Sequence, residues 1–176
     1  MTTLDTLEKR NHDFAEHEFV ADLPIMPGLK TMIISCVDPR VDPTHVLGLE
    51  LGEAVVIRNI GGRITPATLQ AMGMLRMISQ IAGANPEGRF DLIVLHHTDC
   101  GITRLEGKPD LLASYFGIDK AELESKAVTD PRAAVAADIA MIKAKAPLPD
   151  EWAVSGLVYD VKTGLVETVV TPDLRQ

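Results

Sequence analysis

Three short runs of apolar residues, rich in valine and isoleucine, mark the first half of the chain: Thr31–Val37, Ala54–Arg58 and Phe90–His96. The runs are nearly continuous, which is typical of strands covered on both faces in a parallel sheet. Between the second and third runs, Pro66–Gly83 carries its large apolar residues at helical spacing, with proline suited to the first turn and glycine to the end. This order predicts a βαβ unit.

The second half of the chain predicts further helices and a final pair of strands. The helices are expected at Pro109–Phe116, Ala121–Lys126 and Pro131–Ala146, the last with a proline in its first turn. Glu151–Tyr159 and Leu165–Thr171 are strand-like and separated by a glycine-containing turn. The pattern therefore predicts an α/β fold, with a mostly parallel central sheet flanked by helices and a C-terminal hairpin or antiparallel edge strand.

The leading segment differs from the rest of the chain. Leu4–Phe19 is polar and weakly amphipathic, which predicts a helical arm, within residues 1–20, that lies on a neighbouring surface or on another subunit. A length of 176 residues suits one hydrophobic core, so a single domain over residues 1–176 is expected.

The composition indicates which kinds of binding partner and which cellular compartment to expect. The 25 acidic and 17 basic residues give a net charge of -8, and no run of lysine or arginine is present, so nucleic acid is not an expected partner. Met1–Arg10 lacks the apolar core of a secretory signal, and no stretch approaches the ~18 apolar residues of a membrane span. We expect a cytoplasmic protein without a membrane partner, whose two cysteines serve a metal or a reaction rather than a structural disulfide.

Chemically active residues follow two of the predicted strands. The first strand ends in Cys36-Val37-Asp38-Pro39-Arg40, where the proline stops sheet pairing, so that the cysteine, the aspartate and the arginine can share one side. The third strand ends in His97-Thr98-Asp99-Cys100, where a turn can bring the histidine and the cysteine toward one point. Because ligands bind at the carboxyl ends of strands in open α/β sheets, one crevice can hold all five residues.

These residue types predict a catalytic zinc site. Cys36, His97 and Cys100 form a ligand set that zinc accepts, and three protein ligands leave a fourth position for a water whose pKa the metal lowers. Two thiolates should leave that water less acidic than three imidazoles would, so activity should rise above neutral pH. Asp38 can accept the proton of the resulting hydroxide while Arg40 keeps it ionised. Alternatively, Asp38 binds zinc itself and excludes water, with Arg40 released.

At this point the residues resemble a known family. Cys36-x-Asp38-x-Arg40, followed by His97-x-x-Cys100-Gly101, resembles the zinc and dyad motifs of β-class carbonic anhydrases. The connecting segments Arg40–Val46, Gly52–Ala54 and Val56–Gly62 match in order and spacing, so the resemblance covers about Thr31 to Gly107.

The resemblance implies a β-carbonic anhydrase-like fold and reversible hydration of carbon dioxide to bicarbonate. It implies zinc on the Cys2His set, an Asp38–Arg40 dyad, and a homodimer, a homotetramer or another even homo-oligomer with sites near subunit interfaces. For the substrate it implies a contact to the Gly101 amide and a nearby loop shaped by Gly61 and Gly62.

The chain also departs from the family. Pro39 stands where many members have a small residue, and Asp22–Lys30 lacks the glutamine with which many relatives orient the substrate. Some relatives of the short branch hydrolyse carbonyl sulfide or carbon disulfide, which is one alternative function. A non-catalytic zinc or bicarbonate-responsive module is another, and a Cys36–Cys100 redox switch is a third.

Several other residues are assigned structural roles. We expect His96 to be a hydrogen-bonded core histidine and His45 to pack or cap a turn, with proton shuttling as its alternative. Asp99 is expected to cap a helix. The three helix methionines, Met72, Met74 and Met77, are expected to fill space on a buried helix.

Overall fold

The computed structural model describes residues 1–84, 88–145 and 148–172. The elements run in the order α1 (Thr3–His17), β1 (Thr31–Cys36), η1 (Pro39–Val41), α2 (Pro43–Val46), β2 (Ala54–Asn59), η2 (Ile60–Gly62), α3 (Pro66–Ile81), β3 (Phe90–His97), η3 (Gly101–Leu105), α4 (Pro109–Phe116), η4 (Lys120–Lys126), α5 (Pro131–Lys145), β4 (Trp152–Tyr159) and β5 (Val166–Val170).

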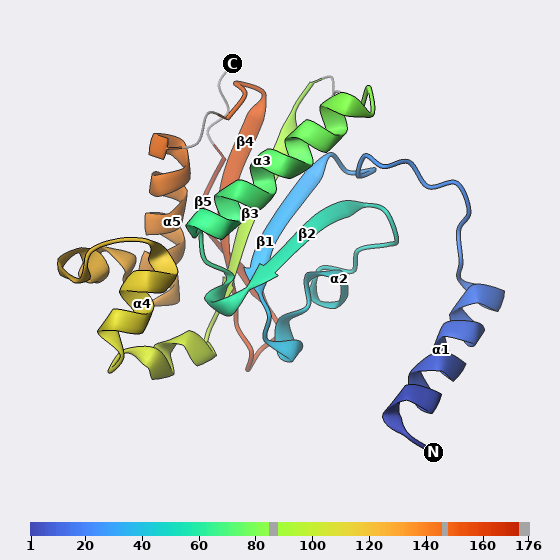
Figure 1. Cartoon of the computed structure of the whole chain (residues 1–176), viewed down its shortest axis with the longest axis horizontal. Coiled ribbons are helices and arrows are strands. Elements are labelled where there is room, and N and C mark those ends of the chain that lie inside the picture. The colour runs from blue at the N-terminus through green and yellow to red at the C-terminus, as the bar shows by residue number, and fades with distance from the viewer. Residues whose placement is uncertain (85–87, 146–147, 173–176) are drawn as a thin grey trace.

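The strands form one five-stranded sheet in the order β2-β1-β3-β4-β5 (Figure 1). β1 pairs in parallel with β2 and β3, and β3 pairs in parallel with β4. Only β5 is antiparallel, joined to β4 as a hairpin. The predicted α/β fold with a mostly parallel sheet and an antiparallel edge strand is confirmed.

Two helices pack on the same face of the sheet. Met72 of α3 and Val135 of α5 share a buried cluster with Ile34, Leu92 and Val94 of the central strands. Gly156 of β4 makes this contact close, because a Cβ there would meet the Cδ1 atom of Ile139 on α5 at 2.5 Å. Helix α5 therefore packs closely against the sheet.

The strand order corrects one sequence expectation. β1 is buried along its whole length, as expected for a strand covered on both faces, but β2 is only partly buried at every position. β2 lies at an edge of the sheet, so it has one neighbouring strand and less cover. The apolar runs of β1 and β2 look alike in the sequence, because hydrophobic periodicity carries no information about the order of strands in a sheet.

The helix predictions hold with small shifts. The helix predicted over Pro66–Gly83 is α3, which ends two residues earlier, at Ile81. Helix α4 has the predicted bounds, and the helix predicted over Ala121–Lys126 is the 3₁₀-helix η4, which begins at Lys120. The last helix begins at Pro131 as predicted, while the predicted final residue, Ala146, lies outside the described residues.

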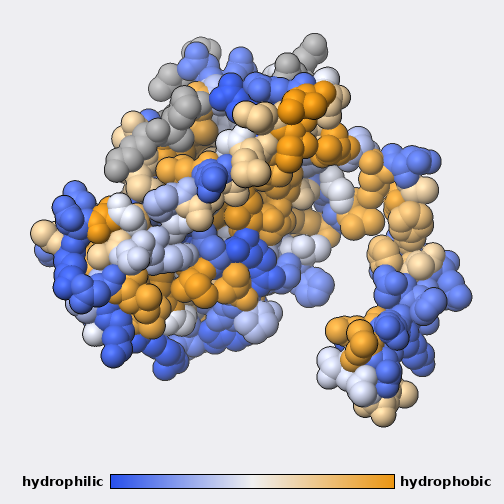
Figure 2. Space-filling model, viewed as in Figure 1, coloured by the Kyte–Doolittle hydropathy of each residue, from blue (hydrophilic) through white to orange (hydrophobic). Residues whose placement is uncertain are grey.

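The methionine prediction is wrong for two of three residues. Met72 is buried, whereas Met74 and Met77 are 59% and 61% exposed. They lie on the side of α3 that faces away from the sheet, together with Ile78 and Ile81, which are also exposed. Figure 2 shows the resulting apolar surface over the outer end of the helix.

The predicted N-terminal helix is present as α1 and has no buried residue. A capping box between Thr2 and Asp5 starts it, since each side chain accepts the other's backbone N–H. Figure 1 shows α1 standing clear of the sheet and its helices. None of the described helices is long and apolar enough to cross a bilayer.

Candidate metal centre

The site lies where the direction of strand addition reverses. The chain passes from β1 to its neighbour β2 and then crosses back, through α3, to place β3 on the other side of β1. At such a switch point the loops after the two central strands diverge and leave a crevice. Cys36 is the last residue of β1, and His97 is the last residue of β3.

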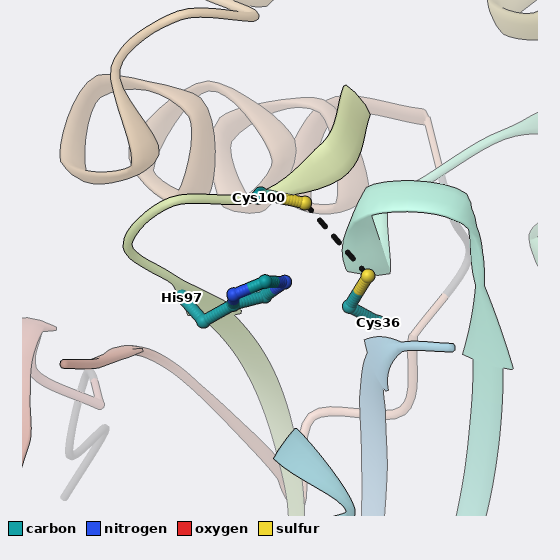
Figure 3. A group of neighbouring side chains, drawn as sticks. All are labelled: Cys36, His97 and Cys100. Atoms are coloured by element: carbon teal, nitrogen blue, oxygen red, sulfur yellow. Dashed lines mark hydrogen bonds between the residues drawn. The ribbon is translucent and has the colours of Figure 1, made fainter. Parts of the chain in front are cut away.

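Three donor side chains converge in this crevice. The sulfur atoms of Cys36 and Cys100 are 3.8 Å apart, and the donor atoms of both cysteines and His97 lie within 4.8 Å of one another. All three side chains are buried, and Figure 3 shows the imidazole ring turned toward the two sulfurs. The predicted convergence of the two strand ends is therefore present.

The orientation of His97 fits a metal. Its Nδ1 atom lies 2.9 Å from the carbonyl oxygen of Thr98, so the N–H is on Nδ1 and the lone pair is on Nε2. The Nε2 atom is buried and has no hydrogen-bond partner among the described residues. An orphaned buried acceptor of this kind, with the other nitrogen fixed by a carbonyl, is the usual arrangement of a metal-binding imidazole.

The two thiols are hydrogen-bonded to each other, with their sulfur atoms 3.8 Å apart. The hydrogen bond with Cys100 is the largest cause that lowers the pKa of Cys36, to about 4, and with the backbone N–H groups of Asp38 and Gly61 it outweighs burial. Conversely, the hydrogen bond to the Cys36 sulfur and burial raise the pKa of Cys100. A divalent cation would replace the proton of this hydrogen bond and stabilise both thiolates, and Cys2His is a donor set that suits zinc.

Asp38 and Arg40 form the predicted pair. Nε and Nη2 of Arg40 donate to Oδ1 and Oδ2 of Asp38 at 3.0 and 2.8 Å, and the backbone N–H of Arg40 donates to Oδ1 at 2.9 Å. Pro39 starts the 3₁₀-turn that brings these groups together. The hydrogen bond from the Arg40 guanidinium is the largest cause that lowers the pKa of Asp38, to about 2, so the carboxylate is ionised at every physiological pH.

Asp99 corrects a sequence expectation. It does not cap the helix that follows: η3 has Cys100 as its N-cap and no side-chain cap bond. Instead its carboxylate accepts from Nη1 of Arg40 at 2.9 Å, and its backbone oxygen accepts from Nη2 at 3.0 Å. Sequence spacing gave no signal for this contact, because it joins residues 59 positions apart.

The three glycines of the predicted site differ in what they do. Gly61 and Gly62 both have positive φ, and a Cβ on Gly62 would lie 2.9 Å from the backbone nitrogen of Cys36. This loop needs glycine because the backbone of β1 leaves no room for a side chain. Gly101, by contrast, is exposed, and a Cβ there would meet nothing within 4 Å.

A second arginine fixes the loop after β1. Nε of Arg58 donates to the carbonyl oxygen of Cys36 at 2.9 Å, and Nη2 donates to that of Asp38 at 2.8 Å. Its remaining nitrogen pairs with Asp42 at 2.5 Å. Sequence reasoning missed this role, although the arginine ends the second predicted strand next to the site.

Behind the metal donors lies a buried ionic cluster that sequence reasoning also missed. Arg63 and Asp138, which are 1% and 0% exposed, form an ion pair at 2.7 Å. His96 is 2% exposed and its Nε2 atom lies 3.1 Å from the oxygen of Gly62 and 3.4 Å from Asp138. The prediction that His96 is a hydrogen-bonded core histidine is confirmed.

A small cavity of about 50 Å³ borders two of the three candidate metal donors, His97 and Cys100. His97 and Cys100 form one side of it, and Ile102, Val128 and Ala134 are apolar parts of its wall. His45 is not part of this cavity and is exposed on the short helix α2.

The fold and the donor set define an α/β protein with a metal-binding group at the switch point of its sheet. The family model described as carbonic anhydrase matches residues 31–166 of the 176. The chain therefore belongs to the carbonic anhydrase family, and the relatives below place it in the β class.

Beta-carbonic anhydrase 1 of Mycobacterium tuberculosis is 34% identical over 102 residues, which cover 58% of this chain and 57% of that relative. A carbon disulfide hydrolase of Saccharolobus solfataricus is 32% identical over 99 residues, covering 56% and 43%. The match thus spans less than two thirds of the length of either curated relative. The structure of a carbonic anhydrase from Streptococcus mutans aligns with a TM-score of 0.72 at 30% identity, over 96% of this chain and 98% of that one.

Proposed function

We propose that this protein is a zinc enzyme that reversibly hydrates carbon dioxide to bicarbonate and a proton. The observation that carries the proposal is the pairing of two features: three buried donors within 4.8 Å, and an ionised carboxylate, Asp38, two residues from one of them. Cys36, His97 and Cys100 would hold the metal. When bound, zinc lowers the pKa of a coordinated water and so supplies the nucleophile at mild pH.

The residues of the chain orient that nucleophile and protect it. Asp38 accepts its proton in a hydrogen bond, which directs an oxygen lone pair toward the substrate carbon. Arg40 holds Asp38 ionised and in place through two side-chain hydrogen bonds. The amide of Gly101, an exposed residue directly after Cys100, would contact the substrate, while Gly61 and Gly62 shape the opposite loop.

The Asp38 side chain has two possible partners, Arg40 and the metal. In the catalytic state it pairs with Arg40 and leaves one metal position to water, and in a closed state it would fill that position itself. The Asp38–Arg40 pair in this structure supports the catalytic state. A non-catalytic zinc or bicarbonate-responsive module would require the closed state to be permanent.

Hydrolysis of carbonyl sulfide or carbon disulfide is the second candidate. It is favoured by the carbon disulfide hydrolase relative and by the small, partly apolar cavity, which suits a linear triatomic molecule. The same nucleophile would attack the same type of carbon, so the two activities differ in the fit of sulfur and oxygen atoms.

Stopped-flow measurement of carbon dioxide hydration from pH 6.5 to 9, with zinc content determined on the same sample, tests the proposal. We expect stoichiometric zinc and a rate that increases with pH. Stoichiometric zinc with hydration at the uncatalysed rate would reject it, and release of sulfide from carbonyl sulfide or carbon disulfide would then support the second candidate.

We further propose that the protein is an even homo-oligomer, a homodimer or homotetramer, in the cytoplasm. Two unpartnered apolar surfaces support assembly: the outer side of α3, with Met74, Met77, Ile78 and Ile81, and the arm α1 with its exposed Leu4 and Leu7. Light scattering after size exclusion would measure the mass, and a monomer at micromolar concentration would contradict the proposal.

A further inference from the structure

Arg40 is held by two carboxylates that come from different loops. On one side it binds Asp38, which follows β1, and on the other it binds Asp99, which follows β3. The guanidinium has four acceptors within 3.0 Å: both carboxylate oxygens of Asp38, Oδ2 of Asp99 and the backbone oxygen of Asp99. Each of its three nitrogens therefore has a partner.

Asp99 adopts an unusual backbone conformation to make this contact. Its φ is +52°, in the left-handed region that residues other than glycine seldom occupy, although aspartate and asparagine tolerate it better than most. The residue before it is fixed, because Thr98 donates its N–H to Tyr159 and accepts from the N–H of Val161. In this conformation both the carboxylate and the carbonyl of Asp99 face Arg40.

Arg40 needs a second anchor. Its side chain is 48% exposed, so one exposed ion pair would hold it only part of the time. Asp38 lies close to the metal donors, with its backbone nitrogen 3.4 Å from the Cys36 sulfur, and besides the Arg40 side chain its carboxylate accepts the backbone N–H of Arg40 at 2.9 Å. The two hydrogen bonds from the Arg40 side chain therefore hold the Asp38 carboxylate in the orientation seen here.

We propose that Asp99 is a positioning residue that holds Arg40 against Asp38, so that the dyad is in fact a three-residue unit, Asp38–Arg40–Asp99. This inference rests on the proposed function in one respect: the role of Asp38 toward the nucleophile. The contact by which Asp99 keeps Arg40 in place does not depend on the reaction. Because Asp99 lies between the donors His97 and Cys100 in the chain, the contact also fixes the dyad relative to the metal site.

The test uses two variants suited to the backbone at this position. Asp99→Asn removes the charge and keeps the size, and Asp99→Gly removes the whole side chain, and both replacements tolerate positive φ. Arg104→Gln is the matched control, since Arg104 is the other cation near Asp99, at 3.9 Å, and does not touch Arg40. All proteins are prepared with zinc, and zinc content and melting temperature are measured on each.

The first readout is the Nε–H resonance of Arg40 in the NMR spectrum of zinc-loaded protein, assigned by its loss in Arg40→Lys. We expect a distinct, slowly exchanging signal in the wild type and in Arg104→Gln. In Asp99→Gly it should move toward the position of a free guanidinium and exchange faster with water, with Asp99→Asn in between. An unchanged resonance in Asp99→Gly would overturn the inference.

The second readout is a double-mutant cycle on kcat. We expect Asp99→Gly to lower kcat about threefold or more at unchanged zinc content and melting temperature, and to have no further effect in an Arg40→Ala background. An equal loss in both backgrounds, or a loss of zinc, would show that Asp99 only supports the ligand loop. If the wild type fails to hydrate carbon dioxide while the resonance responds as expected, the proposed function fails and the positioning role stands.

Discussion

Nε of Arg63 lies 2.7 Å from Oδ2 of Asp138, and both side chains are almost completely buried. The pair joins the loop of Gly61 and Gly62 to α5, because Arg63 follows that loop directly. Asp138 also accepts the backbone N–H of Ile64 at 3.1 Å, and Arg63 donates to the oxygen of Lys126 at 2.7 Å. One ionic contact therefore fixes the wall of the site against the helix that covers the sheet.

Breaking this pair should be strongly destabilising. Asp138→Asn leaves the buried Arg63 charge without its counterion, and we expect the free energy of unfolding to fall by about 3–5 kcal/mol. Urea denaturation monitored by circular dichroism measures it. Glu167→Gln, which breaks the exposed Arg132–Glu167 pair, is the control and should change stability far less. Equal effects of the two replacements would contradict the role assigned to burial.

The same pair predicts a pH dependence. Burial alone would raise the pKa of Asp138, but hydrogen bonds from His96 and Arg63 outweigh it, and the pKa is lowered. A carboxyl whose folded pKa is depressed stabilises the fold above its unfolded pKa, about 3.9, and loses that contribution as the pH falls. The stability difference between the wild type and Asp138→Asn should therefore be constant near neutrality and narrow below about pH 4. A difference that stays constant to pH 3 would contradict this account.

Metal binding should depend on all three donors. We expect about one zinc per chain in the wild type, and Cys36→Ser, His97→Ala and Cys100→Ser should each reduce it at least tenfold. Mass spectrometry of native protein and elemental analysis give the stoichiometry. His45→Ala is the control, because His45 is an exposed histidine outside the site. Full zinc content in any of the donor variants would remove that residue from the ligand set.

The carboxylate of Asp38 should affect the rate of hydration rather than the binding of zinc. Asp38→Asn keeps the size of the side chain but removes the charge that accepts the proton, and we expect kcat for hydration to fall about 100-fold with zinc retained. Stopped-flow kinetics and zinc analysis on one sample separate the two effects. Asp110→Asn, which removes the exposed ion pair between Asp110 of α4 and Lys120 of η4, should leave kcat unchanged. Wild-type turnover by Asp38→Asn would reject the dyad mechanism.

Replacing glycine with alanine should lower the stability of the protein at one position and raise it at another. Gly62→Ala places a Cβ 2.9 Å from the Cys36 nitrogen at a φ of +66°, so it should destabilise the protein and weaken zinc binding. Gly73→Ala meets nothing within 4 Å inside helix α3, and it should stabilise the protein by up to about 1 kcal/mol. Thermal unfolding of both variants checks the prediction, and a stabilised Gly62→Ala protein would show that the loop has room to move.

The sequence by itself determined the strands, most helix bounds and the three residues that converge as candidate metal donors. Apolar runs and helical spacing are local properties, so β1, β3 and α4 were predictable within one or two residues. The donors were predictable because Cys36 and His97 end two parallel strands, and the carboxyl ends of parallel strands meet at one edge.

Only the tertiary structure decided which residues surround the donors. Strand order placed β2 at an edge, and it brought together Arg40 with Asp99 and Arg63 with Asp138. These partners are 59 and 75 positions apart and follow no local period. The tautomer of His97 depends likewise on one carbonyl orientation. Contacts between distant segments arise from how the whole chain packs, and periodicity carries no information about that packing.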